Sequence, residues 1–174
     1  MKSFTEFVGE ERIRSYKIYC DLDEVLVNFL GGIMEELHLR RKPEQDEIDD
    51  FLATAYGSSI RFWSRLGWMP DGRKLWDTLK DLNTEILTAC PHNCQMQPSV
   101  VKGKKVWCAK NLNLHQGVHV PALRKGKMKY AGENHILIDD YIKNINEWTA
   151  KGGIGIHHKS ARKTLVELKK ILLG

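Results

Sequence analysis

The sequence predicts an α/β fold, namely a Rossmannoid parallel sheet with flanking helices and a small helical cap inserted after the first strand and helix. Outside residues 40–83, strand-like and helix-like segments alternate, and that alternation produces parallel strands joined by right-handed crossovers. Inside residues 40–83 no strand pattern stands out. The length of 174 residues and the hydrophobic content of 42% suit one compact domain.

The first strand is expected at residues 16–20 (YKIYC), an apolar run that ends on Asp21. A helix is expected over residues 25–39, where apolar side chains recur at helical spacing. The next stretch is first charged and then aromatic, and we expect two to four short helices there, packed as a cap over the site. The predicted division is therefore a core of residues 1–39 and 84–174 with a cap of residues 40–83.

The remaining elements alternate regularly. Strands are expected at residues 85–88, 117–120, 135–138 and 154–156, and helices at 98–112, around 128–131, through Trp148 and at 161–173. Because ligands of open parallel sheets bind beyond the carboxyl ends of the strands, the residues at those ends matter most. They are Asp21 with Asp23, Thr88, and Asp139 with Asp140, so four carboxylates and a hydroxyl converge on one edge.

These side chains support phosphoryl transfer. Clustered acids repel one another unless a cation holds them together, and hard carboxylate oxygens suit Mg²⁺, which takes further contacts from phosphate. An aspartate can act as the nucleophile, and a second acid two residues on can act as general acid and base. Thr88 supplies a donor for a phosphoryl oxygen, and a lysine from residues 124–129 balances charge. Each acid also has a structural alternative, because acids at strand ends often cap the next helix.

The order of these motifs resembles the haloacid dehalogenase-like (HAD) phosphohydrolases. Their first motif is an apolar strand ending in Asp-x-Asp, here YCDLDEVLVNF, and their second ends in Thr or Ser, here ILTA. The third is a lysine, and the fourth is an acidic pair after another strand, here ILIDDYIKNINEW. Within the family the chain looks most like the 5'(3')-deoxyribonucleotidase branch and its small bacterial and phage relatives. The resemblance covers residues 16 to 172.

The resemblance implies a role for each matching residue. Asp21 would be the nucleophile and Asp23 the general acid and base. Mg²⁺ would be held by Asp21, the backbone carbonyl of Asp23, and Asp139 or Asp140. The phosphate would be bound by Thr88, Ala89 and a lysine, for which spacing and the following Tyr130-Ala131 favour Lys127, then Lys125, then Lys129. Two residues depart from the pattern: Glu24 stands where the family usually has glycine, and Asn28 where the branch often has aspartate.

Three functions follow from these patterns. The first is a phosphomonoesterase acting on a nucleotide, for which Phe62, Trp63 and Trp68 could stack on a base or close the site, although they could equally form the core of the cap. The second keeps the chemistry and changes the substrate to a nucleic-acid 3'-phosphate end or a sugar phosphate. Basic runs at residues 102–105 and 124–129 support the nucleic-acid end. The third is a binding module that has lost catalysis, for which Glu24 is the only support.

The composition of the chain bears on its surface charge, its cellular location and the state of its cysteines. The formal charge of +5 is modest and spread along the chain, which is typical of a solvated surface. The chain has neither a long apolar stretch nor a signal peptide, so we expect a cytoplasmic protein with reduced cysteines. The run Cys90-Pro91-His92-Asn93-Cys94 could supply three zinc ligands, but zinc sites rarely place three ligands in five residues.

Overall fold

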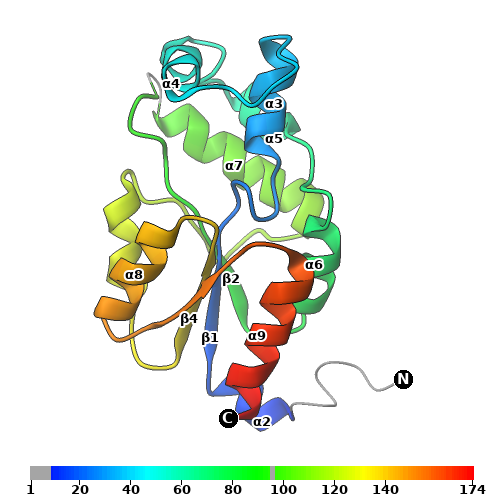
Figure 1. Cartoon of the computed structure of the whole chain (residues 1–174), viewed down its shortest axis with the longest axis vertical. Coiled ribbons are helices and arrows are strands. Elements are labelled where there is room, and N and C mark those ends of the chain that lie inside the picture. Colours follow the sequence, from blue (N-terminus) through cyan, green and yellow to red (C-terminus); the bar gives the residue numbers. More distant parts are fainter. Residues whose placement is uncertain (1–8, 95–96) are drawn as a thin grey trace.

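The computed structural model describes residues 9–94 and 97–174, and its centre is a five-stranded sheet in the order β3-β2-β1-β4-β5 (Figure 1). The strands are β1 (Lys17–Cys20), β2 (Thr84–Leu87), β3 (Val118–His119), β4 (His135–Asp139) and β5 (Ile154–His157). All four strand pairings are parallel, and β1 lies between β2 and β4. The predicted α/β class with a parallel sheet is confirmed, and the strand that leads to Asp21 is central.

Both faces of the sheet are covered, which explains why its strands are apolar runs. Ile18 and Cys20 belong to the larger hydrophobic cluster, together with buried residues of α9 (Ala161–Leu173). Tyr19 points to the other face, where it packs with Trp148 of α8 (Ile142–Ala150). Figure 1 shows α8 on one side of the strands and α9 on the other. The result is a sheet between two layers of helices.

The window 40–83 contains three helices, within the number expected from the sequence. They are α4 (Gln45–Ala53), α5 (Ile60–Arg65) and α6 (Gly72–Leu79). In Figure 1, α4 and α5 lie with α3 (Phe29–Glu36) and α7 (Gln97–Leu112) beyond the carboxyl ends of the strands, whereas α6 lies beside α9. The division into core and cap stays a prediction.

The helix expected over residues 25–39 is wrong at its start, because α3 begins only at Phe29. The preceding residues form a tight turn in which the N–H groups of Leu26 and Val27 both donate to the carbonyl of Leu22. Asn28 then caps the helix, since its side chain accepts a hydrogen bond from the Gly31 N–H at 3.0 Å. The apolar side chains of the turn are buried all the same, so their helical spacing was misleading.

Two further elements differ from the expectations. The short helix expected around residues 128–131 is a 3-10 helix, η1, that begins earlier and covers Arg124–Tyr130. A short helix near the N-terminal end, α2 (Glu10–Arg14), was not predicted. Among the described residues, no helix has the length and apolar character needed to cross a membrane.

Candidate active site

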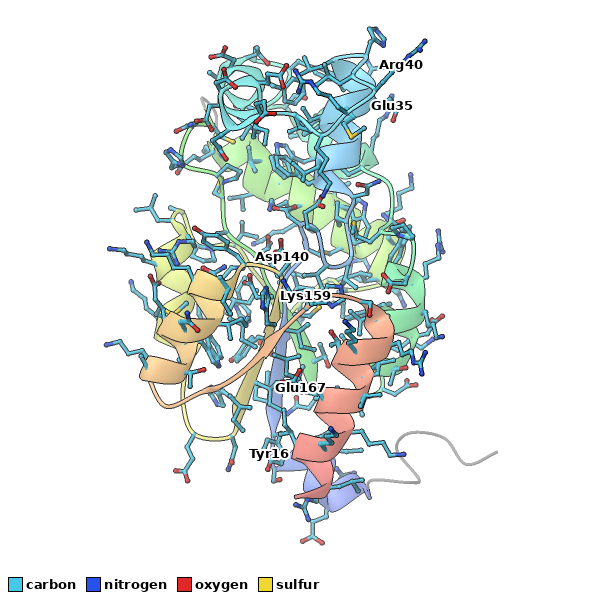
Figure 2. All side chains as sticks on the ribbon, viewed as in Figure 1. Tyr16, Glu35, Arg40, Asp140, Lys159 and Glu167 are labelled. Atoms are coloured by element: carbon cyan, nitrogen blue, oxygen red, sulfur yellow. The ribbon has the colours of Figure 1, made fainter. Side chains whose placement is uncertain are left out.

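Three carboxylates meet at the carboxyl edge of the sheet. Asp21 directly follows β1, Asp139 ends β4, and Asp140 comes next along the chain. One oxygen from each of these three side chains lies within 4.8 Å of the other two. Figure 2 shows Asp140 at the end of the strands that faces the group of α3, α4, α5 and α7, and Tyr16 at the opposite end. Three of the four carboxylates expected at this edge therefore form one cluster, and Asp23 is not part of it.

Lys127 of η1 lies between two of these acids. Its side chain is 1% exposed, and its Nζ lies 2.9 Å from Asp21 Oδ2 and 2.7 Å from Asp139 Oδ2. Burial lowers the pKa of Lys127, but the two carboxylates outweigh it and leave the pKa above its usual value, so the ammonium is charged. Lys125 and Lys129 are exposed. Of the three candidate lysines, Lys127 is the one that reaches the site.

Asp139 and Asp140 have different surroundings. The Asp139 carboxylate accepts hydrogen bonds from the side chains of Asn144 and Lys127 and from the backbone N–H of Tyr141. Within the part of the chain that the structure describes, the Asp140 carboxylate accepts none. Burial, followed by the charges of Asp21 and Asp139, raises the pKa of Asp140 to about 8. Asp140 is therefore the acid of the pair that is free to bind a cation.

The two aspartates of the Asp-x-Asp motif are held separately. Asp21 is nearly buried, and its Oδ1 accepts a hydrogen bond from the Leu22 N–H at 2.8 Å while Oδ2 faces Lys127. Asp23 is 23% exposed and forms a salt bridge with Lys104. Burial raises the pKa of Asp23, while Lys104 opposes that shift. Asp21 is thus fixed at the buried end of the site, and Asp23 lies nearer to solvent.

Lys104 of α7 is a site residue that the sequence analysis missed. It is 2% exposed, and its Nζ donates to Asp23 Oδ2, to Thr88 Oγ1 at 2.9 Å and to the Ala89 carbonyl at 3.0 Å. The run Lys102–Lys105 is used in the sequence analysis only as support for a nucleic-acid substrate. A signal was present: the buried residues of α7 share one helical stripe, and Lys104 is its charged member. They are Val100, Gly103, Lys104, Trp107, Cys108 and Leu112.

The aromatic residues of the predicted cap lie mostly inside the protein. Phe62 and Trp63 are 3% and 1% exposed, and the Trp63 ring stacks on Phe29 with its Nε1 donating to the Gly57 carbonyl. Trp68 is partly exposed and packs against Trp107. Phe62 and Trp63 therefore present no open ring face to a base in this structure. Their packing agrees with the alternative that they form a hydrophobic core, and a role in substrate binding stays a prediction.

Glu24 does not point at the acids. Its backbone has a φ of 57°, the left-handed conformation that favours glycine, which explains why the resembled family usually has glycine there. Its carboxylate Oε1 accepts a hydrogen bond from the Leu30 N–H at 2.9 Å, at the start of α3. An acidic side chain at the positive end of a helix is stabilising. In this chain Glu24 therefore acts as a second cap for α3.

The cysteine run beside Thr88 forms no zinc site among the described residues, since the carboxylate group is the one cluster of potential metal ligands found there. Cys90 and Cys94 are both buried, and Cys90 is fixed by its backbone N–H, which donates to the Pro121 carbonyl. All four cysteines are free thiols, as expected.

Comparison with known proteins places the fold. No protein-family model and no curated protein sequence matches this chain. Among solved structures, it is similar to the hydrolase SP0104 of the haloacid dehalogenase-like family from Streptococcus pneumoniae, with a TM-score of 0.50 and 16% identity over 88% of this chain and 91% of that one. A hydrolase from Streptococcus pneumoniae TIGR4 aligns with a TM-score of 0.49 and 13% identity, covering 91% and 98% of the two chains. The chain has the fold of a haloacid dehalogenase-like hydrolase.

Proposed function

We propose that this chain is a magnesium-dependent phosphomonoesterase of the HAD superfamily that forms an aspartyl-phosphate on Asp21. The observation that carries the proposal is the placement of Asp21, which lies at the end of the central strand with one oxygen on a backbone N–H and the other 2.9 Å from Lys127. A carboxylate fixed in this way, beside a second aspartate and a buried hydroxyl, is suited to attack phosphorus.

The residues divide the reaction as follows. An oxygen of Asp21 attacks the phosphorus atom while Asp23 gives a proton to the leaving oxygen. Asp23 then takes a proton from the water that hydrolyses the aspartyl-phosphate. A lysine ammonium has three hydrogens, and Asp21 and Asp139 take two of those on Lys127, so the third is available to a phosphoryl oxygen. The buried hydroxyl of Thr88 supplies a second donor.

The acids at this edge fit a magnesium ion. Asp21, Asp139 and Asp140 bring three carboxylates within one short span, and one lysine, Lys127, compensates for them at close range. The three carboxylates together carry more negative charge than Lys127 neutralises, and such a cluster of oxygens is suited to bind a hard cation. We propose Asp21 and Asp140 as its direct side-chain ligands. Asp21 is proposed from the motif resemblance. Asp140 is preferred to Asp139 because the Asp139 carboxylate already accepts from Lys127, Asn144 and the Tyr141 N–H. A bound Mg²⁺ would neutralise charge on the phosphoryl oxygens.

The proposed substrate is a nucleotide, as in the 5'(3')-deoxyribonucleotidases, and this part rests on the motif resemblance alone. A nucleic-acid 3'-phosphate end is the second candidate. The observation that favours it is the exposed position of basic residues in both runs, including Lys105, Lys125 and Lys129. Electrostatic contacts with a nucleic-acid backbone would make binding strongly salt-dependent.

The test is turnover of p-nitrophenyl phosphate with Mg²⁺ and with EDTA, followed by a panel of nucleoside monophosphates, sugar phosphates and a 3'-phosphorylated oligonucleotide. The proposal expects metal-dependent turnover that Asp21→Asn abolishes, because an amide cannot form the acyl-phosphate. Asp77→Asn is the control, since Asp77 is an exposed residue of α6 paired with Lys80. Turnover that persists in EDTA or in Asp21→Asn would contradict the proposal. A steep fall in oligonucleotide turnover with salt would identify the second candidate.

A further inference from the structure

We infer that Lys104 is a positioning residue of this site, which holds Asp23 in place and directs the hydroxyl of Thr88. The inference rests on the proposed function and adds to it a residue from α7, an element that carries none of the four motifs. The Lys104 ammonium joins the second aspartate of the Asp-x-Asp motif to the turn after β2, since it donates to Asp23, Thr88 and Ala89. These groups come from two neighbouring strands of the sheet.

The contacts of Lys104 use every hydrogen that it has. A lysine ammonium carries three N–H donors, and three different oxygens accept from Lys104, namely Asp23 Oδ2, Thr88 Oγ1 and the Ala89 carbonyl. No donor is left for a phosphoryl oxygen. Lys104 therefore acts on the groups that touch the substrate rather than on the substrate itself.

The contact with Thr88 has a definite consequence for its hydroxyl. A hydroxyl has one hydrogen to donate, and its oxygen can accept. Because Lys104 Nζ donates to Thr88 Oγ1, the oxygen is the acceptor in that contact and the hydroxyl hydrogen is free to turn elsewhere. Thr88 is 0% exposed, and its backbone N–H is fixed on the His119 carbonyl. A phosphoryl oxygen at the site is the acceptor that such a hydrogen suits.

The contact with Asp23 restrains the proposed general acid and base. Asp23 is 23% exposed, so without a partner its carboxylate would be free to turn toward solvent. A charge-assisted hydrogen bond to a buried ammonium holds one oxygen in place. The other oxygen remains available to the leaving group. Catalysis gains from such fixed geometry because a small displacement of a catalytic group is costly.

The sequence around Lys104 explains how a lysine comes to lie there. Gly103 lets α7 approach α5 closely, since a Cβ on Gly103 would lie 2.6 Å from the Cβ of Trp63 and 3.1 Å from the Ile60 carbonyl oxygen. The close approach puts the Lys104 ammonium 4.6 Å from the centre of the Trp63 ring, a favourable cation–π distance. Trp63 thus supports Lys104 from the side of the predicted cap.

The experiment replaces Lys104 with methionine, which keeps the length of the side chain and removes its charge and donors. Lys110→Met is the matched control, because Lys110 is another lysine of α7 and is exposed. We expect Lys104→Met to lower kcat/KM by about tenfold to a hundredfold, the usual cost of losing a hydrogen bond to a charged group, and Lys110→Met to behave as wild type. Thermal unfolding confirms that each variant is folded, and Lys104→Gln replaces Lys104→Met if the latter does not fold.

Two readouts separate positioning from a purely structural effect. If Lys104 acts through Asp23, Lys104→Met should lower kcat/KM more for a nucleoside monophosphate than for p-nitrophenyl phosphate. The reason is that p-nitrophenolate is a good leaving group and needs little protonation. A double-mutant cycle with Asp23→Asn should show that the effect of Lys104→Met is clearly smaller in the Asp23→Asn background. Equal losses for both leaving groups together with multiplicative effects would overturn the inference. Absence of phosphatase activity in the wild type would instead overturn the proposed function.

Discussion

The site has two buried lysines, one on each side of β1, and they do different work. Lys127 comes from the β4 side and lies between Asp21 and Asp139, two acids that are almost wholly buried. Lys104 comes from the β2 side and has one acidic partner, Asp23, along with two uncharged oxygens. The first lysine mainly compensates charge, whereas the second mainly fixes positions. The two aspartates of the Asp-x-Asp motif are therefore each paired with a lysine from a different element, Asp21 with Lys127 of η1 and Asp23 with Lys104 of α7.

The comparison predicts that Lys127→Met is the more damaging lysine substitution. It leaves Asp21 and Asp139 buried without their cation, and breaking a buried ion pair costs about 3–5 kcal/mol. The proposed phosphoryl contact is also lost, which should lower kcat by about 10²–10³-fold. Lys104→Met leaves one partly exposed acid unpaired and should cost less stability. Chemical unfolding of both variants checks the order, and a Lys104→Met protein less stable than Lys127→Met would contradict it.

The charge surplus on the Lys127 side predicts an unusual effect of Asp140→Asn. Without metal, this substitution removes a repelling acid, so the variant should be more stable than wild type. Added Mg²⁺ should stabilise Asp140→Asn less than it stabilises the wild type. A bound ligand stabilises the folded state by about 2.7 kcal/mol at a hundred times its Kd, and a site with a weaker affinity is stabilised less at the same concentration. Thermal unfolding with and without Mg²⁺ measures both effects. If Asp140→Asn and Asp77→Asn respond alike, Asp140 is not a ligand.

Glu24 predicts a smaller effect, on stability rather than on turnover. Glu24→Ala loses the hydrogen bond to the start of α3 and keeps the left-handed backbone, so it should cost about 0.5–2 kcal/mol, the value of a lost helix cap. Glu24→Gly also loses the cap but relieves the backbone, and should fall between Ala and wild type. Turnover of p-nitrophenyl phosphate should stay close to wild type in both. A rise in turnover in Glu24→Gly would show that the acid hinders the phosphate site.

The smallest expected effect is a pH dependence from His158, behind the site. Burial lowers the pKa of His158, whose Nδ1 lies 2.8 Å from Thr164 Oγ1 and whose backbone N–H donates to the Asp139 carbonyl. Because the pKa of His158 is lower in the folded protein, the unfolded protein binds the proton at a higher pH than the folded protein does. The free energy of unfolding should therefore fall as the pH drops below 6.5, the ordinary pKa of histidine. His158→Gln should flatten the stability curve between about pH 7.5 and 5.5. His115→Gln, at an exposed position, should leave the curve as in wild type.

Much of this site could be predicted from sequence because its residues directly follow strands. The apolar runs ending at Asp21 and Asp139 mark the ends of buried strands, and parallel order brings those ends together. Strand ends therefore identify the acids of the site. Lys127 follows no strand directly, and the sequence favours it only through the motif resemblance, from its spacing to Asp139-Asp140 and from the following Tyr130-Ala131.

Lys104 could not be identified in that way, because its position depends on how α7 packs. It stands among three lysines in four residues, and the one local signal is that it shares a helical stripe with Val100, Trp107 and Cys108. The contact between Gly103 and Trp63 decides the matter, and these residues are far apart in the sequence. The same limit explains the start of α3, because the preceding turn is also held by long-range hydrogen bonds, from the Asn28 N–H to the Gly67 carbonyl and from the Met69 N–H to the Leu26 carbonyl. Such tertiary contacts override local periodicity.

The most direct test of the central claim is detection of the phosphorylated aspartate. Asp23→Asn mixed with p-nitrophenyl phosphate and Mg²⁺ should accumulate the intermediate, because formation needs little acid catalysis while hydrolysis lacks its base. After acid quenching, peptide mass spectrometry should find one phosphoryl group on the peptide that contains Asp21, and none in a variant that also carries Asp21→Asn. A phosphoryl group on another residue, or turnover without any phosphorylated peptide, would contradict Asp21 as the nucleophile.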